Sequence, residues 1–318
     1  MSTGAAPFAF VEAGADAACR AALDRADRLR DDPAALTALW LQARVLLLDD
    51  KGHALADADG NLRAPHGQDI SEGPGGVGAA VFLGLDAHGG GWFALEAALT
   101  AFDAPRRVDL RSAAALWPAF EASVFAQARA LQHWRSRHRF CGVCGGEVTL
   151  SRGGWQGRCQ RCGAEHYPRT DPAVIVAVSD GERLLLGRQS AWPARRYSVI
   201  AGFVEPGETL EQTVAREVLE ETGVRVRRCH YLASQPWPFP GALMLGFAAQ
   251  AEPDVPQVSD ELEAAAWFTR EEVRAACARG EWDGADDDGE GPVLSPSISI
   301  SRWLIEHWLA ADADRHAR

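Results

Sequence analysis

One stretch, residues 201–224 (AGFVEPGETLEQTVAREVLEETGV), constrains the fold of this chain more than any other. Thr209 can cap a helix, because its hydroxyl accepts a bond from the third helical N–H while Gln212 reaches back in a capping box. Gly223 can end that helix, since glycine adopts the left-handed conformation without steric cost. The pattern therefore predicts a helix between Thr209 and Gly223.

Three carboxylates, those of Glu217, Glu220 and Glu221, are spaced three and four residues apart or adjacent in that helix. At about 100° per residue they fall within an arc of about 100°. Like charges this close repel one another unless a cation lies between them, and Mg²⁺ prefers oxygen ligands of this kind. The spacing predicts a divalent-metal site, and a solvated acidic helix face is the alternative.

Four cysteines form two CxxC pairs, Cys141 with Cys144 and Cys159 with Cys162. A glycine follows each pair and allows the tight turn that points both thiolates at one ion. Four protein ligands leave Zn²⁺ no open position, so the pattern predicts a structural zinc ribbon. A redox role is the weaker alternative, because a thioredoxin-like site needs only one CxxC. The locally basic composition of the segment leaves a nucleic-acid-binding ribbon open as well.

Charge and hydropathy exclude several classes of protein. The chain has 318 residues and a formal net charge of −12, which argues against nucleic-acid binding by general electrostatics. No apolar run reaches the 18 or more residues that a membrane span needs, and the first residues lack the pattern of a signal peptide. We therefore expect a cytoplasmic protein that does not enter membranes.

The chain divides into three predicted domains: residues 1–135 as an N-terminal α+β domain, 136–168 as the zinc ribbon, and 169–318 as a further domain. Composition and periodicity predict the elements of these domains. The expected helices are 22–30, 33–43, 124–134 and 301–309, and the expected strands are 44–48, 79–85, 91–95, 173–178, 184–186 and 197–200. The acidic segment 283–290 is predicted to be a solvated loop.

Residues 234–244 (SQPWPFPGALM) form what we call the proline–aromatic segment. Three prolines alternate with two aromatic residues, which predicts a stiff extended stretch whose rings are held in place. Rings held in this way suit stacking against a flat heterocycle, and an ordinary proline-rich loop is the alternative.

Gly202, Glu208 and then residues 216–224 (REVLEETGV) match the Nudix box, so the chain resembles a Nudix hydrolase. The zinc ribbon and the proline–aromatic segment make it similar to the NADH pyrophosphatase subfamily, with the signature SQPWPFPxS, in which Ala242 here replaces the last serine. The resemblance implies an α+β multidomain chain whose C-terminal domain is an α/β/α sandwich with a mixed sheet. It also implies hydrolysis of the pyrophosphate bond of NAD(H), giving NMN(H) and AMP, and the family includes enzymes that remove NAD caps from RNA.

The resemblance further implies which residues form the site. Metal ligands for Mg²⁺ or Mn²⁺ are expected from Glu217, Glu220, Glu221, Glu261 and the carbonyl of Ala201, with Glu220 as the expected base. Glu208 and Arg216 are expected to brace the box. The residues expected to contact the substrate are Tyr167, Phe203, Gln235, Pro236, Trp237, Pro238, Phe239, Pro240, Gly241, Ala242 and Ser301.

The expected partner is a dinucleotide, NAD(H), or NAD-capped RNA, and the expected assembly is a homodimer in which Tyr167 reaches the partner's site. Two other functions remain open. One is a broader pyrophosphatase that acts on ADP-ribose or dinucleoside polyphosphates, which the replacement at Ala242 leaves open. The other is a zinc-ribbon nucleotide sensor without catalysis, which the intact glutamates argue against.

Overall fold

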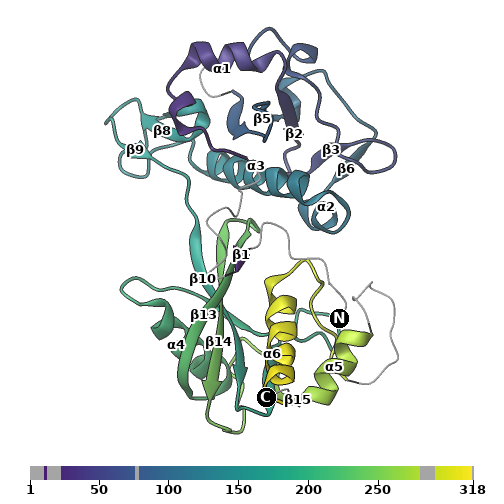
Figure 1. Ribbon diagram of the computed structural model, residues 1–318. Coiled ribbons are helices and arrows are strands. Elements are labelled where there is room, and N and C mark those ends of the chain that lie inside the picture. Colours follow the sequence, from purple (N-terminus) through teal and green to yellow (C-terminus); the bar gives the residue numbers. More distant parts are fainter. Residues whose placement is uncertain (1–10, 13–22, 76–78, 280–290, 317–318) are drawn as a thin grey trace. The chain divides into compact units, whose positions relative to one another are not determined.

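The protein, seen here in a computed structural model that describes residues 11–12, 23–75, 79–279 and 291–316, divides into two compact units (Figure 1). The N-terminal unit comprises Ala17–Thr170 and Trp237–Gly241, and the C-terminal unit comprises Met1–Asp16, Asp171–Pro236 and Ala242–Arg318. The three predicted domain boundaries stay a prediction, and the predicted loop at 283–290 lies outside the described residues. In the part of the chain that is described, no helix is long and apolar enough to cross a membrane.

The N-terminal unit contains a five-stranded sheet in the order β4-β5-β2-β3-β6. The neighbours β2 and β5 are parallel, whereas the other neighbouring pairs are antiparallel. Figure 1 shows helix α1 on one side of this sheet and helix α3 on the other. The elements of this part are η1 (Asp27–Leu29), α1 (Pro33–Trp40), β2 (Arg44–Leu48), β3 (Ala54–Ala56), η2 (Gly67–Asp69), β4 (Val81–Leu85), β5 (Gly91–Glu96), η3 (Ala97–Leu99), β6 (Arg106–Val108), α2 (Leu110–Leu116) and α3 (Ala119–Arg137).

Aromatic rings fill the core between helix α1 and this sheet. Trp40 and Phe93 meet edge to face at 5.3 Å between ring centroids, and Phe82 lies 5.2 Å from Phe93. All three side chains are buried. Edge-to-face pairs at such distances are favourable beyond the area they bury, by about 0.5–1.5 kcal/mol each.

The zinc ribbon closes the N-terminal unit with a small sheet of its own. Strands β7 (Val148–Ser151), β8 (Gln156–Cys159) and β9 (Glu165–His166) pair antiparallel in that order, with η4 (Arg152–Gly154) between β7 and β8. The Nε1–H of Trp155 donates to the carbonyl of Phe82 at 2.7 Å. The ribbon is therefore joined to the five-stranded sheet through a partly buried tryptophan.

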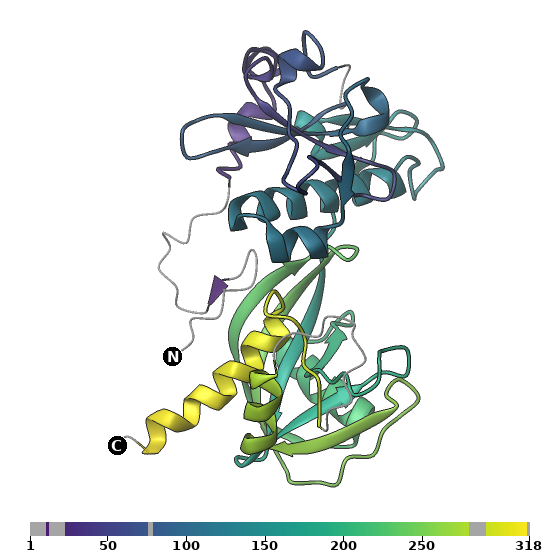
Figure 2. The ribbon, with the colours of Figure 1, turned by 90° about the vertical axis from the view of Figure 1, so that its right-hand side faces the viewer.

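The C-terminal unit is built on a seven-stranded mixed sheet in the order β1-β13-β14-β10-β11-β15, and β12 pairs with β10. Figure 2 shows the same unit turned by 90°, with helix α6 crossing the sheet. The elements are β1 (Val11–Glu12), β10 (Asp171–Ser179), β11 (Arg183–Arg188), β12 (Ile200–Phe203), α4 (Leu210–Thr222), β13 (Val226–Trp237), β14 (Ala242–Ala251), β15 (Ala264–Thr269), α5 (Arg270–Ala278) and α6 (Ile300–His316).

Strand β10 is the centre of that sheet and is buried on both faces. Its alternate residues pack into two separate cores: Val174 and Val176 meet Val218 of helix α4, whereas Ile175 packs with Leu304 of helix α6. Helix α4 therefore covers one face, and α5 and α6 cover the other (Figure 1). The predicted α/β/α sandwich with a mixed sheet is confirmed, as is the α+β multidomain class.

One predicted helix does not form, and one predicted strand begins later than expected. The helix expected at 22–30 is wrong, because only the short turn η1 forms there and Asp24 instead exchanges backbone hydrogen bonds with Leu85. The strand expected at 197–200 begins at Ile200, because the ladder to β10 pairs residues 200–203 with 173–176.

Candidate active site

Helix α4 begins and ends as its sequence predicts. The hydroxyl of Thr209 accepts from the N–H of Gln212 at 3.2 Å, and the side chain of Gln212 accepts from the N–H of Thr209 at 2.8 Å. Gly223 ends the helix with φ +69°, in the left-handed region. This capping box and glycine fix which residues of the helix face the sheet.

Arg216 ties the loop before helix α4 to the helix itself. Its guanidinium donates to both carboxylate oxygens of Glu208, at 2.6 and 2.9 Å, and to the carbonyl of Phe203 at 3.0 Å. It also pairs with Glu217 and Glu220, each at 3.0 Å. The hydrogen bond from Arg216 lowers the pKa of Glu208 to about 2. Glu208 and Arg216 thus brace the box, as expected from the sequence.

Two carboxylates of helix α4 are buried. Glu217 is 9% exposed and Glu221 is 7% exposed, whereas Glu220 lies on the exposed side of the helix. Burial, followed by the charges of Glu217, Glu261 and Glu220, raises the pKa of Glu221 to about 8. A buried carboxyl that other carboxylates surround is costly to ionise, and a bound divalent cation would remove that cost. The oxygen donors of this cluster are therefore of the kind that a hard metal ion prefers.

Glycine at position 202 allows the backbone of β12 to approach this cluster. A methyl group built on Gly202 would lie 1.8 Å from the carboxyl carbon of Glu217. Ala201, the neighbouring residue, pairs with Ile175 in the ladder between β12 and β10. The carbonyl expected to bind metal is therefore carried by a strand that is hydrogen-bonded along its length and packs against the buried glutamate.

Glu261 and Glu263 precede strand β15, and they have different neighbours. Glu263 forms an ion pair with Arg188. Glu261 lies near enough to Glu217 and Glu221 to raise the pKa of both, after burial and the other causes that act on them. Of the two, Glu261 is the one that the fold brings to the carboxylate cluster.

The four cysteines of the ribbon converge on one point. Their sulfur atoms all lie within 4.8 Å of one another, with Cys141 and Cys162 at 3.7 Å and Cys144 and Cys159 at 3.5 Å. Tetrahedral Zn²⁺ with Zn–S bonds of about 2.3 Å places its sulfur ligands about 3.8 Å apart, so the cluster fits zinc.

Backbone N–H groups support these thiolates. The N–H groups of Arg161 and Cys162 each lie 3.4 Å from the sulfur of Cys159. The N–H of Cys162 is the main cause that lowers the pKa of Cys159 to about 6. Glycines at positions 145 and 163 make the necessary turns at φ +71° and +76°. The site has no open position, so it is suited to hold the fold together rather than to react.

The proline–aromatic segment is extended at both ends, as predicted, and turns in its middle. Strand β13 ends at Trp237, residues 238–241 turn, and β14 begins at Ala242. The prediction of extended backbone was wrong for the turn, because the two strands run antiparallel and must reverse. The rings of Trp237 and Phe239 meet edge to face at 4.9 Å, and the guanidinium of Arg111 lies 4.5 Å from the ring of Phe239.

Two residues expected to contact the substrate instead form hydrogen bonds within the C-terminal unit. Gln235 is fully buried; its side chain donates to the carbonyl of Ile298 and accepts from the N–H of Ile300, both at 2.8 Å. Ser301 is 2% exposed, and its hydroxyl lies 2.8 Å from that of Ser198. These contacts fix the start of helix α6 against strand β13. The sequence offered no signal for Ser198.

Two aromatic residues expected to hold a base are exposed on the units that carry them. Tyr167 is 52% exposed and Phe203 is 60% exposed. The hydroxyl of Tyr167 donates to Glu165 at 2.5 Å, which raises its pKa, and accepts from Gln156 at 2.9 Å. Each ring therefore presents a face to which a flat group could bind. Gln156 and Glu165 orient the tyrosine, and the sequence analysis missed both.

The remaining members of the expected substrate set lie along the same turn. Pro236 is the last residue of the C-terminal unit before it, and residues 237–241 group with the N-terminal unit. Arg129 donates to the carbonyl of Pro238 at 3.3 Å. The peptide bond between Phe239 and Pro240 is cis. Gly241 and Ala242 complete the turn, and the roles of all these residues toward a substrate stay a prediction.

The chain matches the NUDIX domain over residues 169–286 and the NADH pyrophosphatase zinc ribbon domain over residues 136–167. The protein named NAD-capped RNA hydrolase NudC from Mycobacterium bovis (strain BCG / Pasteur 1173P2) is 42% identical over 301 residues, which cover 92% of this chain and 94% of that protein. NAD-capped RNA hydrolase NUDT12 from Homo sapiens is 40% identical over 200 residues, covering 59% of this chain and 42% of that protein.

Among solved structures, a NUDIX hydrolase from Nitrosomonas europaea is 27% identical with a TM-score of 0.37, and the match covers 42% of this chain and 78% of that one. The two matched domains contain different parts of the site. The cysteine cluster lies within the match to the zinc ribbon, and the glutamate cluster lies within the match to the NUDIX domain.

Proposed function

Because this chain belongs to the Nudix hydrolase family and carries the NADH pyrophosphatase zinc ribbon, we propose that it hydrolyses the pyrophosphate bond of NAD(H). The products are NMN(H) and AMP. The same bond joins an NAD cap to RNA, so removal of NAD caps is part of the proposal. The relatives that support it are named NAD-capped RNA hydrolases.

The observation that carries the proposal is the buried carboxylate cluster of helix α4. Glu217 and Glu221 lie inside the unit with Glu261 nearby, and the pKa of Glu221 is raised to about 8. We propose that Glu217, Glu221, Glu261 and the carbonyl of Ala201 hold Mg²⁺ or Mn²⁺. When bound, such an ion neutralises charge on the bridging phosphate oxygens and lowers the pKa of water.

Two further residues beside this cluster, Arg216 and Glu220, have proposed roles in positioning and in proton transfer. Arg216 holds Glu217 and Glu220 through ion pairs of 3.0 Å, so it fixes where both carboxylates point. Glu220 is exposed and is the proposed acceptor of the proton that the attacking water loses. A base must reach that water within hydrogen-bond distance, and an exposed residue that adjoins Glu221 and lies about one turn from Glu217 satisfies the need for access.

Recognition of the dinucleotide is assigned to the exposed aromatic rings and to the proline–aromatic segment. Phe203 lies two residues after Ala201 on strand β12, and Tyr167 is held by Glu165 and Gln156. Both rings are more than half exposed, which supports stacking on a base or on nicotinamide. We propose a homodimer in which the tyrosine ring serves the partner's site; a monomer by analytical ultracentrifugation would contradict this part.

The ribbon is proposed to bind one structural Zn²⁺ through its four cysteines. Sulfur–sulfur distances of 3.5 and 3.7 Å support that assignment. The role is to fold the ribbon, since no position remains for substrate.

The test is a comparison of initial rates for NADH, NAD, ADP-ribose and NAD-capped RNA with Mg²⁺ or Mn²⁺. We expect NAD(H) or the NAD cap to be preferred, with cleavage between the two phosphates. Equal rates on all four compounds would instead support the broader pyrophosphatase, which Ala242 in place of serine leaves open. Tight binding without turnover of any of them would support the nucleotide sensor.

A further inference from the structure

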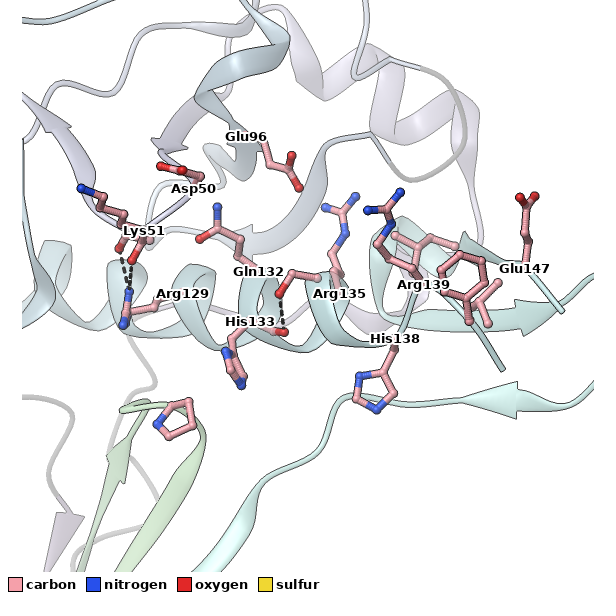
Figure 3. A pocket seen from close by; sticks show the side chains of 16 residues that line it. Asp50, Lys51, Glu96, Arg129, Gln132, His133, Arg135, His138, Arg139 and Glu147 are labelled. Atoms are coloured by element: carbon pink, nitrogen blue, oxygen red, sulfur yellow. Dashed lines mark hydrogen bonds between the residues drawn. The ribbon is translucent and has the colours of Figure 1, made fainter. Parts of the chain in front are cut away.

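A cleft of about 760 Å³ lies within the N-terminal unit, and none of its lining residues belongs to the carboxylate or cysteine clusters. Its walls are the turn at residues 50–52, the last part of helix α3, and the segment that enters the ribbon. Figure 3 shows Arg129, His133, Arg135 and Arg139 following one another along α3 and the segment after it.

Cations dominate the lining, although the whole chain is acidic. Four permanently charged side chains and two imidazoles face three carboxylates, within a chain whose net charge is −12. The cations and imidazoles are Lys51, Arg129, Arg135, Arg139, His133 and His138, and the carboxylates are Asp50, Glu96 and Glu147. The local balance is therefore opposite in sign to that of the protein.

Part of this charge has a structural use. Arg129 donates to the carbonyls of Lys51 and Gly52 at 3.0 Å each, and Arg135 donates to the carbonyl of Ala79 at 3.3 Å. Basic residues at the end of a helix also stabilise its dipole. Such roles account for the two arginines within the helix, but not for the lysine on the turn or for Arg139, which follows the end of α3.

Lys51 and Arg139 differ from their neighbours. Both side chains are exposed, and neither forms a hydrogen bond or an ion pair with another described residue. Two cations at the rim of one cleft, without a protein partner in the described part of the chain, can each bind an anionic group of a ligand.

Basic side chains of α3 supply positive charge near the cleft, where the C-terminal end of the helix dipole is itself negative. Arg129, His133 and Arg137 are spaced four residues apart on α3 and so share one face. Burial first, and then the charges of Arg137, Arg129 and His138, lower the pKa of His133. A neutral imidazole between arginines leaves hydrogen-bonding capacity without adding to their repulsion.

We propose that this cleft binds phosphodiester groups of the RNA chain that follows an NAD cap, with Lys51 and Arg139 as the residues that contact phosphate. The inference rests on the proposed function, because it needs capped RNA as a substrate. Phosphate neutralisation by a few local cations is how an acidic protein can hold a nucleic acid. A free dinucleotide has no such chain, so the cleft distinguishes the two substrates.

The test uses the double variant Lys51→Ala/Arg139→Ala in the full-length protein. A matched control is Arg28→Ala/Arg228→Ala, which removes two exposed charges elsewhere whose side chains form no ion pair with any residue that the structure describes. We expect kcat/KM for NAD to stay within about twofold in both variants. For NAD-capped RNA, KM should rise at least about fivefold in the cleft variant alone, since two phosphate contacts are lost.

Binding of uncapped RNA, measured by fluorescence anisotropy at several salt concentrations, gives a readout that does not depend on catalysis. Each phosphate contact on a single strand contributes about 0.7 to the slope of log affinity against log salt, so the slope should decrease by about 1.4 in the cleft variant. Lys51 is the only lysine of the chain. RNA should therefore slow reductive methylation of this one side chain, whereas inorganic phosphate at the same phosphate concentration should not.

Two results would overturn the proposal: an unchanged KM and salt slope in the cleft variant, or an equal loss of activity on NAD and on capped RNA. Protection by inorganic phosphate as strong as that by RNA would assign the cleft to small anions instead. If the proposed function itself is wrong, the measurements give a different set of results. In that case the wild-type protein would cleave neither substrate, while the binding and protection measurements would still report on the cleft.

Discussion

Replacing Gly202 by alanine tests how the backbone of β12 positions the buried glutamate. The backbone of Gly202 lies outside the positive-φ region, so its backbone conformation is one that alanine also adopts. The added methyl, however, would lie 1.8 Å from the carboxyl carbon of Glu217 and 2.1 and 2.3 Å from its two oxygens. One of the two groups must move, and β12 is held by its ladder to β10.

The size of the effect follows from this distance. Ordinary contact begins at about 3.4 Å, so the carboxylate must move by about 1.6 Å from its position at 1.8 Å. A misplacement of about 1 Å in a reacting group can cost about 100-fold in rate. We therefore expect kcat to fall at least about 100-fold, which corresponds to about 2.7 kcal/mol.

The assay is the initial rate of NADH hydrolysis with saturating Mg²⁺, together with the melting temperature. Gly73→Ala is the control, because its methyl would meet nothing nearer than 4.0 Å. The control should keep wild-type rate, and Gly202→Ala should remain folded. A folded Gly202→Ala protein with wild-type kcat would refute the claim that Glu217 must occupy this position.

Three further predictions concern the buried glutamate and the ribbon. Glu221→Gln should abolish NADH turnover while the protein stays folded and zinc-bound. Turnover at the wild-type rate in this variant would contradict the metal-site assignment. Because the pKa of Glu221 is about 8 when folded and 4.5 ordinarily, its stabilising contribution is complete below pH 4.5 and is lost as pH rises through 8. Melting temperatures without added Mg²⁺ should show this decline, and Glu221→Gln should flatten it. Cys144→Ser should lower zinc, measured by atomic absorption, to well below one ion per chain.

The parts of the site that could be predicted depend on residues close together in sequence. Thr209 and Gln212 satisfy each other's backbone groups within one helical turn, and Gly223 stops the helix by its own conformational freedom. The cysteine pairs likewise specify their own tight turns. In each of these cases the determining atoms lie within a few residues, so the pattern is sufficient.

The parts that could not be predicted depend on distant partners. Gln235 is buried because its side chain bonds backbone groups 63 and 65 residues later, at the start of helix α6. Residues 22–30 have helical composition, yet Asp24 pairs with Leu85, and this long-range bridge overrides a weak local preference. The local sequence indicates neither the register of a strand ladder nor the distant partner of a buried side-chain amide.

The short pairing of β12 with β10 has a consequence for transplanting the site. Ala201 lies opposite Ile175 because of backbone hydrogen bonds, so the position of its carbonyl does not depend on which apolar side chain occupies β10. A slip by one residue would present a different carbonyl and turn Gly202 away from Glu217. A graft that moves helix α4 alone into another scaffold would therefore leave the site incomplete, whereas a graft that carries the β10–β12 pair with the helix would keep its geometry.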